Sequence, residues 1–165
     1  MGPKQAISTG FRKSFDLSGR ASRSEFWWFA PVAFVSPISV GLLLDWSMSE
    51  NWVFWRLIPI AAASIPLLAA MHRRLQDVGE NGQQAFYPFS TILIIWLGYR
   101  FLLGFGLLVG GPILLFLVAL LLFVPMLVIA ITAGAIVTSN IVGMMLIASE
   151  PGVNQFGPPN GEVSI

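Results

Sequence analysis

Apolar residues along the chain are gathered into long runs that are separated by short polar breaks. The runs cover Phe26–Leu44, Val53–Met71, about Ala85–Val109 and Pro112–Ala148. The breaks are Asp45–Asn51, His72–Gln84 and the Gly110-Gly111-Pro112 turn. About 20 apolar residues cross the hydrocarbon core of a bilayer, so each run is long enough for at least one span.

The fold class follows from the need to satisfy backbone hydrogen bonds inside a lipid bilayer. No water is present to bond peptide groups in the bilayer core, so a spanning segment must be a helix or a strand of a closed barrel. The prolines and glycines inside these runs do not follow the alternating pattern of barrel strands. The sequence therefore predicts an all-α, polytopic transmembrane helical protein.

The number of spans depends on the last run. As one helix, Pro112–Ala148 would be about 55 Å long at ~1.5 Å per residue, against a hydrocarbon core of about 30 Å. Either it extends beyond the bilayer with a kink at Pro125, or it breaks near Gly134 or Thr138-Ser139-Asn140. We expect four spans, with five as the alternative.

Basic residues indicate the orientation of the spans. Five precede the first run and two follow the second, whereas the loop Asp45–Asn51 has none: Lys4, Arg12, Lys13, Arg20 and Arg23, then Arg73 and Arg74. By the positive-inside rule the amino terminus and the His72–Gln84 loop are cytoplasmic. The predicted domains are a cytoplasmic or interfacial segment 1–25, a transmembrane domain 26–149 and a polar C-terminal tail 150–165.

The segment before the first run has a helical pattern of its own. Ile7, Phe11 and Phe15 are spaced i, i+4, i+8, and Lys4, Arg12 and Lys13 are basic. This pattern is typical of a short amphipathic helix that lies in the headgroups. Gly10 disfavours a helix, so a partly ordered basic tail is the alternative.

Charged and aromatic residues meet in the stretch GRASRSEFWW, residues 19–28. Ser22 and Glu25 have the spacing of a capping box, which predicts that a helix starts here. Phe26, Trp27 and Trp28 would then lie at headgroup depth as interfacial aromatics.

Composition narrows the function further. The chain is 56% hydrophobic and 10% charged, whereas soluble domains carry about 25% charged residues. The absence of cysteine excludes disulfides, Cys-ligated zinc, iron–sulfur clusters and thiol catalysis. A net charge of +1 does not support nucleic-acid binding, and the single histidine, His72, has no companion metal ligands. We therefore expect no cofactor and no metal.

A charged cluster is expected at the cytoplasmic ends of the first two spans. Their short loop makes them an antiparallel hairpin, so the start of one and the end of the other lie on the same side. The cluster comprises Arg20, Arg23, Glu25, Arg73, Arg74 and Asp77. We predict that Glu25 or Asp77 bonds an arginine of the opposite segment, Asp77 being the better acceptor for Arg20 or Arg23. Arg73 and Asp77 are also spaced i, i+4 and could pair on one helix face.

Arg100 lies in the middle of the third apolar run. An arginine at this depth costs a few kcal/mol, so it normally faces a partner, a cavity or an interface. Either the span ends near Arg100 and the side chain snorkels to the interface, or the arginine is a functional intramembrane residue.

Three short motifs resemble the domain-of-unknown-function 805 family of small bacterial inner-membrane proteins. The family pattern is Gly-Arg-x-x-Arg-x-Glu-[Phe/Tyr]-Trp, then Arg-Arg-Leu-His-Asp-x-Gly, then Pro-Gly-x-Asn-x-[Phe/Tyr]-Gly. Matching positions are Gly19, Arg20, Arg23, Glu25, Phe26 and Trp27, then Arg73, Arg74, Leu75, Asp77 and Gly79, then Pro151, Gly152, Asn154, Phe156 and Gly157. Gln76 stands where the family has histidine, and the longer region before the last motif implies an extra helical span.

The motifs hold no nucleophile–base pair, so the first hypothesis is a non-enzymatic membrane protein. Its cluster would order the helix ends and contact anionic lipid headgroups or a protein partner, including a second copy. The second hypothesis is a small oligomeric transporter or channel subunit that uses Arg100. An intramembrane enzyme ranks below both, because Glu25 and Asp77 are surrounded by arginines, which suits ion pairing better than acid catalysis.

Overall fold

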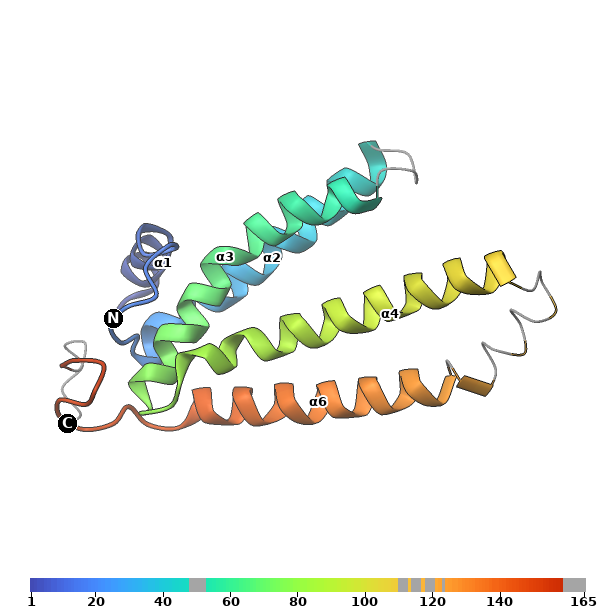
Figure 1. Cartoon of the computed structure of the whole chain (residues 1–165). Helices are drawn as coiled ribbons and strands as arrows, with labels where there is room; N and C mark the ends of the chain where they lie inside the picture. The colour runs from blue at the N-terminus through green and yellow to red at the C-terminus, as the bar shows by residue number, and fades with distance from the viewer. Residues whose placement is uncertain (48–52, 110–112, 114–116, 118–120, 123, 159–165) are drawn as a thin grey trace. The chain divides into compact units, whose positions relative to one another are not determined.

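The computed structural model describes residues 1–47, 53–109, 113, 117, 121–122 and 124–158, and it is all-α over this part of the chain. The elements are α1 (Pro3–Arg12), α2 (Arg23–Ser47), α3 (Val53–Asp77), the 3₁₀ turn η2 (Gly82–Phe86), α4 (Tyr87–Val109) and α6 (Val124–Leu146) (Figure 1). Each of these long helices corresponds to one predicted apolar run, although α6 covers only the second part of the run Pro112–Ala148. The chain divides into two compact units, Met1–Ala85 with Met144–Ile165, and Phe86–Gly143.

The first unit is built on α2 and α3, which pack along each other as an antiparallel pair (Figure 1). Small residues allow this close approach, since Ala33 and Ala69 are fully buried. A Cβ added at Gly41 would lie 3.7 Å from Ile60 Cδ1. Helix α2 extends through Asp45 to Ser47, and residues 48–52 of the predicted loop lie outside the described part of the chain.

Two of the described helices, α2 and α6, are long and apolar enough to cross a membrane. Their apolar side chains are mostly exposed, among them Val35 and Leu43 on α2 and Ile129 on α6. Water-soluble monomers rarely expose apolar surface in such large contiguous patches. These helices therefore have the exterior of membrane spans.

Helix α1 confirms that the segment before the first run contains a helix, and it packs on α2. Its buried positions, Ala6 and Gly10, are small, and Ser14 in the turn that follows α1 is also buried. Of the predicted apolar stripe, Phe11 is exposed on one side and meets Phe29 of α2 edge-on, with the ring centroids 5.2 Å apart, whereas Phe15 is exposed. Small residues allow the close approach of α1 to α2, and the Phe11–Phe29 ring pair adds to the contact.

The second unit consists of α4 and most of α6. The two helices approach at Thr91 and Gly134, where an added Cβ would lie 3.0 Å from Thr91 Cγ2. Beside this contact is an open groove of about 560 Å³ with mostly apolar walls. Thr91 and Ile95 of α4 and Gly134 and Thr138 of α6 line part of it.

Helix α6 covers the second part of the last apolar run. It is continuous from Val124 to Leu146, so the expected breaks at Gly134 and at Thr138-Ser139-Asn140 are wrong. Pro125 is the second residue of α6 and follows residues 121–122, which are π-helical. The predicted kink at Pro125 stays a prediction, because residue 123 lies outside the described part of the chain. The predicted Gly110-Gly111-Pro112 turn lies outside the described residues.

Candidate functional site

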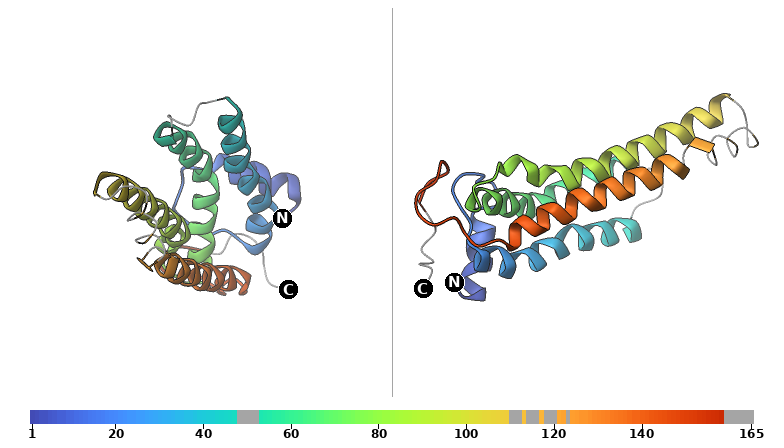
Figure 2. Two further views of the ribbon diagram at one scale, coloured as in Figure 1. Left: turned by 90° about the vertical axis from the view of Figure 1, so that its right-hand side faces the viewer. Right: turned by 90° about the horizontal axis from the view of Figure 1, so that it is seen from below.

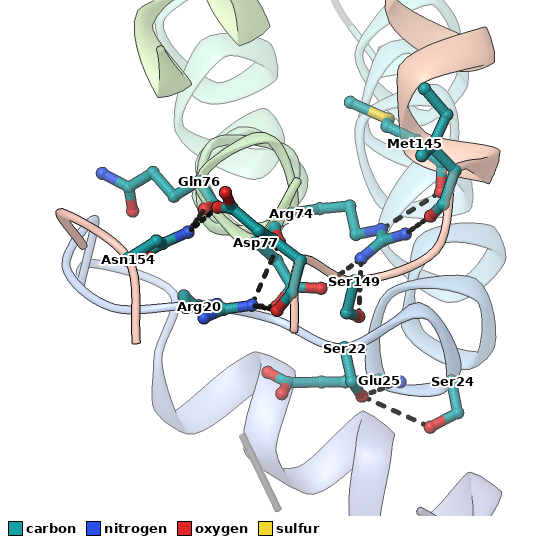
Figure 3. Close-up of polar contacts among 12 residues, drawn as sticks. Arg20, Ser22, Ser24, Glu25, Arg74, Gln76, Asp77, Met145, Ser149 and Asn154 are labelled. Carbon is teal, nitrogen blue, oxygen red and sulfur yellow. Dashed lines mark hydrogen bonds and ion pairs between the residues drawn. The ribbon is translucent and has the colours of Figure 1, made fainter. Parts of the chain in front are cut away.

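Three segments that are distant in sequence meet within the first unit (Figure 3). They are the residues that lead into α2, the last turn of α3, and the chain that follows α6. We call the charged residues at their centre the arginine junction, comprising Arg20, Glu25, Arg73, Arg74 and Asp77. All five side chains are at most about 3% exposed.

The start of α2 has the predicted cap. Ser22 Oγ accepts a hydrogen bond of 3.2 Å from the backbone N–H of Glu25, which satisfies one free donor of the first turn. Just before the cap, the N–H of Ala21 donates to the carbonyl of Arg73 at 3.1 Å. A backbone bond therefore ties the entry to α2 directly to the end of α3.

Two ion pairs cross between these segments. Arg73 Nη1 lies 3.0 Å from Glu25 Oε1, and Arg20 Nε lies 2.9 Å from Asp77 Oδ1. The prediction that a carboxylate of one segment bonds an arginine of the other is confirmed for both Glu25 and Asp77. Arg20 is the partner of Asp77, whereas Arg23 is exposed.

Asp77 accepts from a second arginine on its own helix, Arg74, at i, i+3. The expected i, i+4 pairing of Arg73 with Asp77 is wrong, because Arg73 turns to Glu25 on α2. Helix α3 thus ends with two adjacent arginines that serve different partners. One holds α2, and the other holds Asp77 and the segment after α6.

Backbone carbonyls supply the remaining acceptors for Arg74. Its Nε donates to the carbonyl of Met145 at 3.1 Å, its Nη2 donates to the carbonyl of Ile147, and its Nη1 donates to Ser149 Oγ at 3.3 Å. Carbonyls at a helix C-terminus lack helical partners and carry partial negative charge. Arg74 therefore caps α6 from outside that helix.

Arg20 likewise donates hydrogen bonds to backbone carbonyls, here in the chain after α6. Its Nη1 donates to the carbonyl of Gly152 at 2.7 Å and of Gly157 at 3.3 Å. Its Nη2 donates to the carbonyls of Glu150 and, at 3.2 Å, of Asp77. One guanidinium thus binds the end of α3 and a folded loop more than 130 residues away in sequence.

The loop after α6 is folded by its own hydrogen bonds. Asn154 and Gly157 exchange backbone bonds of 3.2 and 3.0 Å, and Asn154 Oδ1 accepts from the N–H of Phe156 at 2.9 Å. Asn154 Nδ2 donates to the carbonyl of Gln76 at 3.0 Å, and the N–H of Glu150 donates to the carbonyl of Asp77 at 2.9 Å. The loop is thereby fastened to the end of α3.

The junction holds three cations and two carboxylates. Burial of this excess positive charge is balanced by the carbonyl groups that face Arg20 and Arg74, since buried charge is tolerated when it is paired and hydrogen-bonded. Arg73 Nη2 is a buried donor without a hydrogen-bond acceptor among the described residues. Over the same residues no group of three or more His, Asp or Glu could hold a metal ion.

These contacts unite three motifs of one family in a single structure. The sequence profile described as "Protein of unknown function (DUF805)" matches residues 14–158, which include all three motifs. The chain belongs to the DUF805 family. No curated protein and no solved structure matches it.

The DUF805 motif glycines have a structural reason. Among the described residues, positive φ occurs at Gly19, Gly79, Gly152 and Gly157, and each is a motif position. At Gly79 (φ +83°) an added Cβ would also lie 2.9 Å from Glu150 Oε2. A side chain at this position would therefore strain the backbone and press on the docked loop.

Gln76, the departure from the DUF805 pattern, also lies in this region and is buried. In the amide orientation that suits its surroundings, its nitrogen donates to the carbonyls of Gly19 at 2.6 Å and Leu17 at 3.1 Å. His72, one turn earlier, has a pKa below the usual value, because burial disfavours the charged form more than bonds to Leu17 and Gln76 favour it.

The predicted interfacial aromatics differ in exposure. Trp27 and Trp28 are exposed, whereas Phe26 is buried and contacts the Trp27 ring edge-on at 5.2 Å, so Phe26 belongs to the core and does not present an interfacial surface. In the second unit, Arg100 is exposed and lies over the Trp96 ring, with Cζ 5.8 Å from the ring centroid.

Residue-level reasoning missed the carbonyl groups of Met145, Ile147, Glu150 and Gly152 as partners of the arginines. Backbone acceptors leave no residue-type signal. The one available sign was the Pro-Gly-x-Asn-x-Phe-Gly motif, whose glycines indicated a folded loop and not a plain polar tail.

Proposed function

We propose that this DUF805 protein is a multi-pass bacterial inner-membrane protein of four spans, and that its arginine junction is a non-enzymatic structural element on the cytoplasmic side. The junction orders the helix ends and presents a folded surface to lipid or to a protein partner. The observation that carries this proposal is the meeting of all three motifs in one buried hydrogen-bonded network.

Four spans are favoured over five by the position of the C-terminal loop. Arg20 precedes α2 and bonds the carbonyl of Gly152, so the loop lies at the end of the α2–α3 hairpin where α2 begins. The chain that leaves this end after α3 must therefore return to it. An even number of crossings satisfies this requirement, and α4 and α6 are the two long helices that the structure describes between α3 and this loop.

A structural role is favoured because the carboxylates are occupied and covered. Glu25 is 2% exposed and bonds Arg73, and Asp77 is 1% exposed and accepts from Arg20 and Arg74. An acid–base catalyst must reach the proton that it moves in the substrate. The junction arginines are equally covered, so contacts with partners fall to the exposed residues around it.

Cysteine accessibility tests the topology, since the chain has no native cysteine. Single variants Ser8→Cys, Ser49→Cys and Gln155→Cys would be treated with a membrane-impermeant maleimide in right-side-out and inside-out vesicles. We expect positions 8 and 155 to react from the cytoplasmic side and position 49 from the opposite side. Reaction of positions 8 and 155 from opposite sides would instead establish an odd number of spans.

A second candidate function is a subunit of an oligomeric transporter or channel. The supporting observation is Arg100, which is exposed on an otherwise apolar helix. A cation facing lipid in the bilayer core is costly, and a neighbouring copy or a water-lined path would remove that cost. Loss of a measured solute flux in Arg100→Leu, with retention in Arg100→Lys, would support this role. Equal flux in both variants would exclude it.

A further inference from the structure

Helix α1 has three distinct sides. Ala6, Gly10 and Ser14 are buried on the side that faces α2. Phe11 in the last turn of α1 is 47% exposed and Phe15 in the turn that follows the helix is 85% exposed, although both are large and apolar. Gln5 and Arg12, which a helical wheel places away from these aromatics, are exposed polar residues, and Thr9 on the same side is partly exposed. The profile match begins after this helix, so the arrangement belongs to this chain and not to the shared motifs.

The contact with α2 fixes the depth of α1. A Cβ on Gly10 would lie 2.3 Å from a ring carbon of Phe29, and the rings of Phe29 and Phe11 meet edge-on at 5.2 Å. Phe29 lies about 9 Å along α2 from Arg23, at ~1.5 Å per residue. Helix α1 therefore lies beside the first turns of α2, level with the exposed Trp27 and Trp28.

The direction of α1 agrees with this placement. Figure 2 shows α1 lying across the α2–α3 pair at the end where α2 begins, and not alongside it. If α2 crosses the bilayer, a helix that lies across it runs parallel to the membrane plane. In-plane amphipathic helices bury their apolar face about 5–10 Å into the boundary between headgroups and acyl chains.

Charge indicates which lipids would cover this surface. The segment 1–19 carries three cations, Lys4, Arg12 and Lys13, against one carboxylate, Asp16. Asp16 is engaged locally, since its Oδ1 accepts from the N–H of Ser18 at 2.9 Å and from its hydroxyl. The junction arginines are buried. The cations of α1 are thus available to headgroups, and basic side chains near an anionic surface are attracted to it.

We propose that α1 is an in-plane anchor that binds anionic phospholipid headgroups of the cytoplasmic leaflet and inserts Phe11 and Phe15 at the headgroup–acyl boundary. This inference rests on the membrane placement proposed above. Exposed aromatics, adjacent cations and crosswise packing against α2 together fit a lipid surface.

The test uses the full chain in vesicles of neutral phosphatidylcholine, with and without one quarter phosphatidylglycerol. Single cysteines at Phe15→Cys, Thr9→Cys and Val35→Cys would carry an environment-sensitive fluorophore. We expect the label at position 15 to be blue-shifted, and quenched by nitroxides on shallow acyl carbons, more strongly with the anionic lipid. The label at position 9, on the polar side, should stay water-like. Combined Lys4→Gln, Arg12→Gln and Lys13→Gln changes should remove the anionic-lipid dependence.

The label at position 35 separates this inference from the proposed function. If position 35 is quenched and position 15 stays water-like in both vesicles, α1 is not an anchor, although α2 is a span. If position 35 is not quenched, the membrane placement itself fails. Equal quenching at position 15 in neutral and anionic vesicles would overturn recognition of anionic headgroups. Shielding in native membranes but not in pure lipid would assign the surface to a protein partner and overturn the proposal.

Discussion

Replacement of Arg20 by methionine is the most direct test of the arginine junction. Methionine keeps an unbranched apolar side chain but removes the guanidinium. Buried Asp77 then loses one of its two cationic partners, and the carbonyls of Asp77, Glu150 and Gly152 lose a charged donor. We expect the C-terminal loop to detach from the end of α3.

The free-energy cost of Arg20→Met follows from the burial of the ion pair. Breaking a buried ion pair by removal of one partner costs about 3–5 kcal/mol. Arg74 remains beside Asp77, so we place the cost of Arg20→Met near the lower bound, at about 3 kcal/mol. Because 1.4 kcal/mol corresponds to a factor of ten, the equilibrium for opening the loop should rise on the order of 100-fold.

The assay is the rate at which a thiol reagent labels Gln155→Cys in detergent-solubilised protein, with the midpoint of chemical denaturation as a second measurement. Arg23→Met is the matched control, because it is the same substitution three residues away on an exposed side chain. Exposed sites of this kind change stability by at most about 0.5 kcal/mol, so the control should label like the parent.

Equal labelling of the Arg20→Met and Arg23→Met proteins would refute the junction as the structure describes it. A double-mutant cycle with Asp77→Asn adds a sharper criterion. Residues in direct contact normally show a coupling energy of about 0.5–3 kcal/mol. A coupling near zero would mean that the Arg20–Asp77 contact is not formed in the membrane protein.

Three further predictions concern single positions. Gly79→Ala should destabilise the protein by about 1–2 kcal/mol, because residue 79 has a left-handed backbone conformation. The new methyl group would also press on Glu150, so thiol labelling of the loop at Gln155→Cys should become faster. An unchanged labelling rate would contradict this prediction. Gly10→Val should release α1 from Phe29, which would be measured as faster proteolysis of the first 15 residues. The denaturation midpoint of α2 and α3 should change little. A proteolysis rate equal to that of the parent protein would argue against the contact. His72 follows the proposed span Val53–Met71, and its pKa is lowered in the folded protein. Below a pH of about 6.5, the unfolded chain therefore binds a proton at this histidine more readily than the folded protein does. Stability should therefore fall as pH drops below that value, and His72→Gln should show a flatter pH dependence; identical slopes would exclude the histidine as the cause.

Much of the fold could be predicted because apolar runs are a strong one-dimensional signal. Each long helix that the structure describes corresponds to one of the four runs, although α6 covers only the second part of the last run, and α2 begins immediately after Ser22, where the capping box predicted its start. The break in the last run was predicted less well. Gly134 and Asn140 looked like interruptions, yet a helix within a bilayer retains its backbone bonds through such residues because no water competes for them.

The candidate site was predictable as far as complementary charges on a hairpin allow. Arg20 and Asp77 had to lie on the same side, and their opposite charges made a bond favourable. The choice between Arg73 and Arg74 as the helical partner of Asp77 could not be made from spacing, because both i, i+3 and i, i+4 neighbours reach the same face. The position of Glu25 determines this choice, because Arg73 forms its ion pair with Glu25 of α2 and Arg74 is left to bond Asp77.

The three arginines of the junction join different pairs of segments, and this explains why the motifs occur together. Arg73 links α3 to α2 through Glu25, Arg74 links α3 to the end of α6, and Arg20 links the entry of α2 to the C-terminal loop. Lipid provides little hydrophobic drive for helices to associate, so polar bonds and close packing must supply it. Loss of any one segment would leave a buried guanidinium or carboxylate without its partner, which costs more than the bond itself contributes. Disruption of any one motif is therefore expected to destabilise the contacts of the other two, because all three are parts of one connection between helix ends.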